Sequence, residues 1–152
     1  MIHLEHLNLV VSDLEASQHF YQAAFPHWYV RAKGESTWYG KARRWLHLGD
    51  DYQYLALNDD GEGLNRDLTG HQVGLAHFAF VTHNLDALIV RLEQAGYEID
   101  HPGAKEIHRK NVYFIDPNGF EVEFVEYFSD LPRERNSSAD PKANIAQKEV
   151  LA

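Results

Sequence analysis

The sequence predicts an α+β fold in which a unit of one strand, one helix and three further strands occurs twice. Two stretches, "HLNLVVSDLEASQHFYQAAF" and "HFAFVTHNLDALIVRLEQAG", each pass from a strand pattern through a polar turn into an amphipathic helix pattern. Each helix is followed by three short apolar segments that turn residues separate. Aligning the two stretches pairs His6 with His77, Val10 with Val81, Leu14 with Leu85, Ala16 with Ala87 and Ala24 with Ala95.

Length and composition indicate one globular domain. The chain has 152 residues, of which 44% are hydrophobic, enough for a substantial core. It has no cysteine, which excludes disulfides and thiolate metal sites, so any metal must be held by His, Asp or Glu. A formal charge of -9 disfavours nucleic-acid binding. No apolar run approaches the roughly 20 residues of a membrane span, and the start lacks a signal-peptide pattern, so we expect a cytoplasmic protein with no membrane partner.

The first unit opens with a strand whose alternate residues are apolar. His6 and Asn8 therefore lie on the face opposite the buried one. Ser12 and Glu15 form a capping-box pattern that predicts the start of the helix, and Pro26 predicts its end. The three later strands are expected in "HWYVRA", "ARRWLHLG" and "YQYLALN".

The second unit follows the same pattern. Phe78 and Phe80 share one strand face, so His77 again faces away from the apolar side. Apolar residues then recur at helical spacing, and Gly96 is a typical C-terminal stop. The later strands are expected in "YEIDHP", "KNVYFID" and "FEVEFVEYF", with "DPNG" as the turn between the last two.

These elements define one domain over residues 1–130. It contains a first module, 2–58, and a second module, 72–130, joined by a polar linker, 59–71, that is rich in Gly and Asp. Residues 131–152 are polar and poor in aromatic residues, which indicates a loose tail or a surface helix.

The last strand supplies candidate metal ligands. Glu121 and Glu123 alternate with apolar residues, so both carboxylates lie on the face opposite the core. If the polar faces of the two units form a shared cup, His6, His77 and one of these glutamates converge there. Two imidazoles and a carboxylate can hold a divalent metal and leave positions open for substrate or water. Taken singly, each residue is an ordinary surface residue, and only the combination predicts a site.

Three segments together resemble the vicinal oxygen chelate superfamily of glyoxalase I, methylmalonyl-CoA epimerase, fosfomycin-resistance thiol transferases, bleomycin-resistance proteins and extradiol dioxygenases. They are "HLNLVVSDLEASQHFY", "GLAHFAFVTHNLDAL" and "YFIDPNGFEVEFVEY". The resemblance implies two βαβββ modules whose mixed sheets form a cup around a metal. It also implies His6, His77 and Glu123 as the ligands, with Glu123 chosen because it lies four residues after Gly119 of the turn.

The sequence departs from part of that superfamily at a fourth ligand position. Glyoxalase I and the epimerase carry Glu or Gln in the last strand of the first unit, where "LAL" puts Ala56. Strand parity places Tyr54 and Ala56 on the cup face, as it does Asn8, and we expect these three residues to contact substrate. The missing carboxylate favours an open, three-ligand site similar to that of the extradiol dioxygenases and the fosfomycin-type transferases.

The resemblance also implies catalytic residues beside the metal. Tyr113 lies ten residues before Glu123, where the dioxygenases carry a tyrosine that hydrogen-bonds the substrate. The dioxygenases also use a histidine as acid or base, and the loop "DHPGAKEIHRKN" offers His108, which we select, or His101. A core tyrosine and exposed loop histidines are the alternatives.

The expected function is that of a divalent-metal enzyme with dioxygenase-like chemistry on a small oxygenated substrate. The alternatives are a glyoxalase-type lyase or isomerase, a fosfomycin-type thiol transferase, and a metal-free drug-binding protein of the bleomycin-resistance kind. Fe(II) or Mn(II) is favoured, and the ligand set also suits Zn, Ni or Co. The resemblance further implies a homodimer, with modules that pair within one chain or are exchanged between two chains.

Overall fold

The computed structural model describes residues 2–104 and 106–137. Both units of strand, helix and three strands are present, so the predicted α+β class is confirmed. In chain order the elements are β1 (His6–Val10), α1 (Leu14–Ala24), β2 (Tyr29–Trp38), β3 (Lys41–Gly49), β4 (Tyr54–Asn58), β5 (His77–Val81), α2 (Leu85–Gln94), β6 (His101–Pro102), β7 (Arg109–Ile115), β8 (Glu121–Tyr127) and α3 (Pro132–Arg135).

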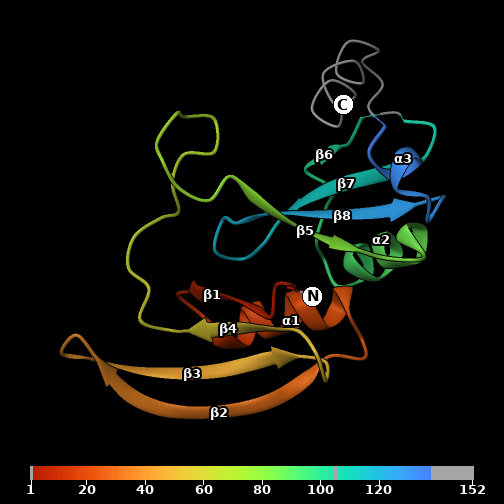
Figure 1. Cartoon of the computed structure of the whole chain (residues 1–152). Helices are drawn as coiled ribbons and strands as arrows, with labels where there is room; N and C mark the ends of the chain where they lie inside the picture. The colour runs from red at the N-terminus through yellow and green to blue at the C-terminus, as the bar shows by residue number, and fades with distance from the viewer. Residues whose placement is uncertain (1, 105, 138–152) are drawn as a thin grey trace.

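Each unit forms its own four-stranded mixed sheet (Figure 1). The strand order is β1-β4-β3-β2 in the first sheet and β5-β8-β7-β6 in the second. In both sheets the first strand of the unit runs parallel to the last one, and the remaining pairs are antiparallel. The strands β1 and β5 therefore occupy equivalent edges of the two sheets.

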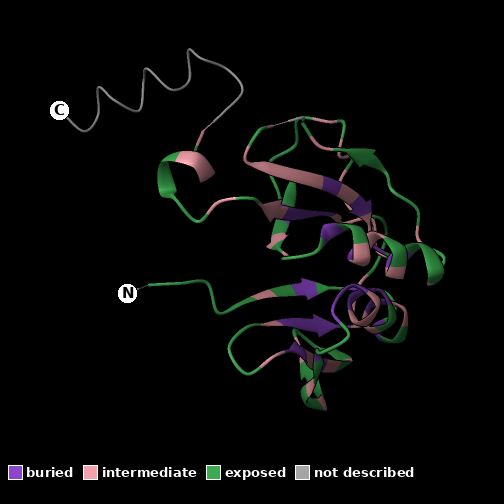
Figure 2. Ribbon diagram, turned by 90° about the vertical axis from the view of Figure 1, so that its right-hand side faces the viewer, coloured by how far each residue is buried: buried purple, intermediate pink, exposed green. Residues whose placement is uncertain are grey.

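The apolar faces of the sheets join the two helices in one core. Helices α1 and α2 contact each other where the units meet, and buried residues gather on the helices and the strands beside them (Figure 2). Aromatic rings cross between the units, because Phe25 and Trp28 of the first unit pack on Phe80 of the second at ring-centroid distances of 4.9 and 5.5 Å. The polar face of each sheet points away from this core.

Hydrogen bonds fix one unit on the other. The guanidinium of Arg91 on α2 donates to the carbonyl oxygens of Ala23 and Ala24 at 3.1 and 2.8 Å, where the C-terminal end of α1 favours a cation. The buried hydroxyl of Tyr21 donates to the carboxylate of Asp116, in the turn before β8, at 2.9 Å. Both contacts join residues that are far apart in sequence.

The capping box predicted at the start of α1 is wrong. Asp13 is the N-cap, and its carboxylate accepts the backbone N–H of Ala16 at 2.9 Å. Ser12 instead donates its backbone N–H and its hydroxyl to Asn118 Oδ1, at 2.9 and 3.2 Å. The reason is tertiary, because Asn118 in the turn before β8 accepts the backbone N–H of Ser12 that Glu15 would accept in a capping box.

Two strands differ in length from the prediction. The expected strand "HWYVRA" extends through β2 as far as Trp38, because β2 pairs with all of β3 in a long hairpin. Tyr39 and Gly40 close this hairpin with positive φ angles of 46° and 84°. In the second unit, only His101 and Pro102 of "YEIDHP" are strand.

The predicted helix end and the predicted tail both have counterparts. Gly96 has a φ of 89° and donates its N–H to Glu93 O, while Tyr97 donates to Leu92 O, the hydrogen-bond pattern of a Schellman motif. The short helix α3 lies in the segment expected to be a tail or a surface helix. Residues 138–152 of that segment lie outside the described residues. Within residues 2–104 and 106–137, no helix is both long and apolar enough to cross a membrane.

Candidate metal centre

The polar face of the second sheet brings His77 beside two glutamates. Parallel pairing of β5 with β8 puts His77 opposite Glu121. Glu123 is the next residue of β8 on the same face. His77 Nε2 lies 3.3 Å from Glu123 Oε2, and His77 Nδ1 lies 3.5 Å from Glu121 Oε2. Nε2 and Glu123 Oε2 can therefore bind one ion together. The opposite ring nitrogen faces a carboxylate, an arrangement typical of metal-binding histidines.

Asn111 on β7 orients the carboxylate of Glu123. Its Nδ2 donates to Glu123 Oε1 at 2.6 Å and lies 3.3 Å from the hydroxyl of Tyr113. Glu123 is 9% exposed, so this amide holds one oxygen of a nearly buried carboxylate and leaves Oε2 toward His77. The sequence reasoning missed Asn111, although it shares a strand face with Tyr113, two residues away.

Tyr113 faces Glu123 across the β7–β8 pair. Its ring packs edge-on against His77 at a centroid distance of 5.6 Å and lies parallel to His101 at 4.3 Å. Burial raises the pKa of the Tyr113 hydroxyl, and the negative charge of Glu123 raises it further. Tyr113 is therefore protonated at neutral pH and can donate a hydrogen bond.

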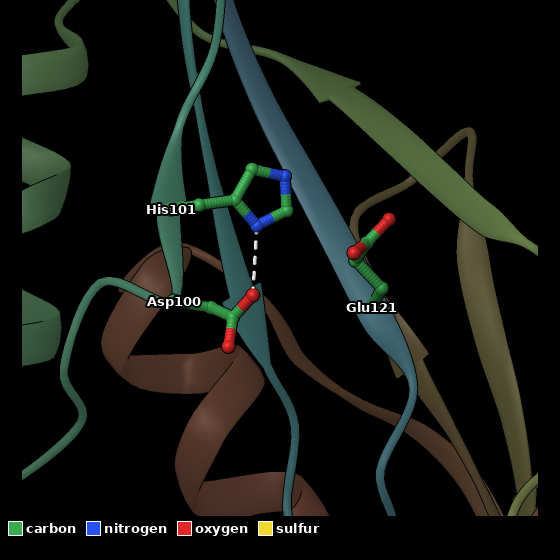
Figure 3. Close-up of side chains that lie close together, drawn as sticks. All are labelled: Asp100, His101 and Glu121. Carbon is green, nitrogen blue, oxygen red and sulfur yellow. Dashed lines mark hydrogen bonds and ion pairs between the residues drawn. The ribbon is translucent and has the colours of Figure 1, made fainter. Parts of the chain in front are cut away.

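His101 lies in a cluster with Asp100 and Glu121, at the edge of the same polar face (Figure 3). Its Nδ1 is 2.7 Å from Asp100 Oδ2. One ligand atom from each of the three residues lies within 4.8 Å of the others, and they form the one such group of His, Asp and Glu found among residues 2–104 and 106–137. Glu121 thus lies between His101 and His77.

His108 lies apart from this cluster. It precedes β7, its carbonyl accepts the N–H of Phe128, and its Nδ1 lies 4.0 Å from a carboxylate oxygen of Glu134 on α3. Five residues separate it from Tyr113, or about 16 Å along an extended strand. Of the two loop histidines considered from the sequence, His101 is the one that contacts Tyr113.

The polar face of the first sheet carries His6. Its Nδ1 lies 2.9 Å from Glu5 Oε2, and its ring stacks on Tyr54 at a centroid distance of 4.7 Å. Ala56 is 6% exposed and lies between Asn8 on β1 and a residue of β3. The side chain of Asn8 is also ordered, because its Oδ1 accepts the amide of a buried asparagine of β4 at 2.6 Å.

Further aromatic and basic groups surround Tyr54 on this face. His47 lies against the Tyr54 ring on the side away from β1, at a centroid distance of 4.6 Å, and Trp45 lies 5.0 Å from His47. The guanidinium of Arg31 lies 4.6 Å from the centre of the Tyr54 ring. His47 is a second residue that the sequence reasoning missed.

Comparison with known proteins identifies the family. The sequence model of the Glyoxalase/Bleomycin resistance protein/Dioxygenase superfamily matches residues 3–124. The chain belongs to this superfamily. The superfamily contains enzymes as well as non-enzymatic members, so membership leaves the reaction open.

Solved structures of other superfamily proteins share the fold. A glyoxylase/bleomycin resistance protein/dioxygenase domain from Frankia sp. EAN1pec is 20% identical, with a TM-score of 0.69 over 90% of this chain and 99% of that chain. A glyoxalase family protein from Enterococcus faecalis is 24% identical, with a TM-score of 0.65 over 82% and 97%. A mutant of the fosfomycin resistance protein FosX from Listeria monocytogenes, complexed with Mn(II) and 1S,2S-dihydroxypropylphosphonic acid, is 18% identical, with a TM-score of 0.66 over 90% and 100%.

In this member of the superfamily, the three predicted ligands belong to different sheets of one chain. His6 lies on the first sheet, whereas His77 and Glu123 lie on the second. Their ligand atoms do not gather within 4.8 Å of one another in the described part of the chain. We call His6 with Glu5 the first half-site, and His77 with Glu123 the second half-site.

Proposed function

We propose that the protein is a divalent-metal-dependent enzyme that acts on a small oxygen-bearing substrate, with His6, His77 and Glu123 as metal ligands. One observation carries this proposal. Each ligand side chain has two nitrogen or oxygen atoms, and the atom that would not bind the metal has a polar partner of its own. Such partners fix the orientation of metal ligands and tune their basicity. The partners are Glu5 for His6, Glu121 for His77 and Asn111 for Glu123.

The two half-sites are proposed to meet between two copies of the chain, in a homodimer. The edge strands β1 and β5 support this arrangement, because each leaves one side of its sheet available to a second copy. Val10 and Val81 on these strands are 48% and 54% exposed, and a cavity of about 990 Å³ lies beside Val81. It is lined by His6 and apolar residues of both units, including Phe80. Burial of such a surface favours association.

The chemistry follows from the open side of such a site. A divalent metal would supply Lewis acidity and, as Fe(II) or Mn(II), redox chemistry with dioxygen. Tyr113 would donate its proton in a hydrogen bond to a substrate oxygen beside Glu123. Asp100 holds Nδ1 of His101, so the other ring nitrogen is available for proton exchange near Tyr113. His108 also stays a prediction, although it lies before β7 and away from Tyr113. These groups suit a dioxygenase-like reaction on a substrate with neighbouring oxygens.

A fosfomycin-type reaction is the second candidate. It is supported by the similarity to FosX, whose solved complex contains Mn(II) and a dihydroxypropylphosphonic acid. A phosphonate needs cations, and Arg31 on the first sheet provides one beside Tyr54. Arg109 on the second sheet is less available, because Glu106 pairs with its guanidinium at 2.7 Å.

Elemental analysis of protein purified without a histidine tag tests the proposal. We expect close to one transition metal per chain in the parent, and little in His6→Ala or Glu123→Ala. A metal-free parent would overturn the metal-enzyme proposal. If the parent contains metal, oxygen consumption with a panel of catechols would support the dioxygenase, whereas opening of the fosfomycin epoxide without oxygen uptake would support the second candidate.

A further inference from the structure

His47 is a titratable residue on the polar face of the first sheet that the proposed metal centre does not use. Register places it in a row that crosses four strands, with Ala32 on β2 at one side, and Ala56 and then Asn8 at the other. Both direct neighbours are alanines, so neither covers the imidazole. We call these four residues the His47 row.

Aromatic rings stand on both sides of the His47 row. Tyr54 lies on one side and Trp45 on the other, at centroid distances of 4.6 and 5.0 Å from His47. Gly34 permits this position of the indole, because a Cβ there would lie 2.9 Å from Trp45 Cζ2. The row therefore alternates two alanines with the polar side chains of His47 and Asn8, between two aromatic rings. Such a surface suits a planar or compact molecule that carries hydroxyl groups.

The position of His47 separates it from the metal ligands. His6 on β1 and His47 on β3 belong to the strands that flank β4, and their ring centroids lie 4.7 and 4.6 Å from that of Tyr54 on β4. The Tyr54 ring thus stands between the two imidazoles, so His47 is not placed to bind the same ion as His6. His47 is placed to contact a molecule that lies over Ala56.

His47 also differs from the other sheet histidines in its charge environment. A ring nitrogen of each of His6, His77 and His101 lies within 3.5 Å of a carboxylate oxygen. Among the described residues, no carboxylate or other group affects the pKa of His47 through a hydrogen bond. Burial lowers the pKa of His47, and the nearby His6 and Arg31 lower it further, against an opposing effect of Glu5. The imidazole is therefore neutral at neutral pH and has a lone pair available.

We propose that His47 is the base that accepts a proton from a hydroxyl group of the substrate bound over Ala56. The O–H bond breaks, the proton passes to a ring nitrogen of His47, and the electron pair stays on the substrate oxygen. This inference rests on the proposed function, because the anionic oxygen is the atom that a divalent metal would bind. It places a proton acceptor on the first sheet, where the glyoxalase pattern would have a carboxylate in place of Ala56.

The test uses full-length, metal-loaded protein and nitrocatechol, a vicinal diol whose absorbance reports its ionisation. The variants are His47→Gln and His47→Asn, and the control is His71→Gln, in an exposed position before β5. Metal content is measured first in each protein. In the parent and the control, bound nitrocatechol should ionise about one pH unit or more below its ionisation in the two His47 variants. Nitrogen NMR should show that His47 of the parent gains a proton when the probe binds.

The outcomes separate this inference from the proposed function. Full metal content with unchanged probe ionisation in both His47 variants would overturn the role as base and leave the metal centre standing. Loss of metal from both variants would overturn it as well, because His47 would then be needed by the metal itself. A parent that binds no metal would overturn both proposals.

Discussion

The side chain of Asn111 fills the space that any side chain at Gly103 would need. A Cβ built on Gly103 lies 1.8 Å from Asn111 Oδ1, and the backbone N–H of Gly103 donates to the carbonyl of Asn111 at 2.9 Å. Because the Asn111 amide also holds Glu123 Oε1, the glycine lets Asn111 on β7 fix the orientation of Glu123, the proposed metal ligand on β8. Gly103 therefore supports the second half-site without touching it.

Gly103→Ala should consequently weaken metal binding. The new methyl group must displace the Asn111 amide, which would release Glu123, and losses of roughly 10- to 100-fold in metal affinity are typical when such a supporting contact is removed. Competition with a chromophoric chelator measures the affinity, and circular dichroism checks the fold. Asn111→Ala is the matched variant, since it removes the same amide without crowding. Parent-like affinity in both variants would contradict the supporting role.

Glu121→Gln tests the carboxylate beside His77. Glutamine keeps the shape of the side chain but removes the charge that faces Nδ1, so His77 becomes a weaker ligand and metal affinity should fall by roughly 10-fold or more. Glu98→Gln, at an exposed position after α2, is the charge-matched control. Chelator competition with both variants gives the comparison. An equal metal affinity in Glu121→Gln and Glu98→Gln would mean that Glu121 does not support His77 as a ligand.

Asp116 gives the protein a pH dependence of stability that can be isolated. The residue is 3% exposed, and burial raises its pKa above 3.8. A raised pKa in the folded state means that the protonated form is favoured there, so this contribution to stability is full below 3.8 and is lost as the pH rises through the folded pKa. The free energy of unfolding of the parent should therefore fall relative to that of Asp116→Asn as the pH rises. Urea titrations at several pH values would measure it, and a constant difference would contradict the assignment.

Strand parity carried most of what could be predicted from the sequence. Alternation put His6, His77 and Glu123 on the polar faces and placed Ala56 opposite the core, and the core that the structure describes includes Leu55 and Leu57 on either side of Ala56. Parity is a local property, because the alternation of faces can be determined from the residues of a single strand. The fold class follows instead from the repeated order of one strand, one helix and three strands.

The parts of the site that were missed depend on contacts between distant segments. His47 becomes notable only because register sets it between Ala32 and Ala56. His101 meets Tyr113 because the short strand β6 pairs with β7 at that residue, and sequence spacing did not separate it from His108. Register of this kind depends on which strands pair and on the turns that join them, and the periodicity of a single strand encodes neither.

Exchange of modules between two chains makes a quantitative prediction for mixed variants. In a dimer with exchanged half-sites, His6→Ala mixed with Glu123→Ala yields a heterodimer in which one site has both defects and the other has neither. Random assortment makes half of the dimers mixed, so metal content per chain should recover to about a quarter of the parent value. Elemental analysis after unfolding and refolding the two variants together measures this recovery.

The control for this experiment is each variant refolded alone, which should stay metal-free. If instead the modules pair within one chain, every chain in the mixture carries a damaged site, and the mixture should bind no more metal than its components. Sedimentation of the parent gives a second check, because exchange requires a dimer at the concentrations used. A monomeric parent with full metal content would rule out exchange and require His6 to reach His77 and Glu123 within one chain.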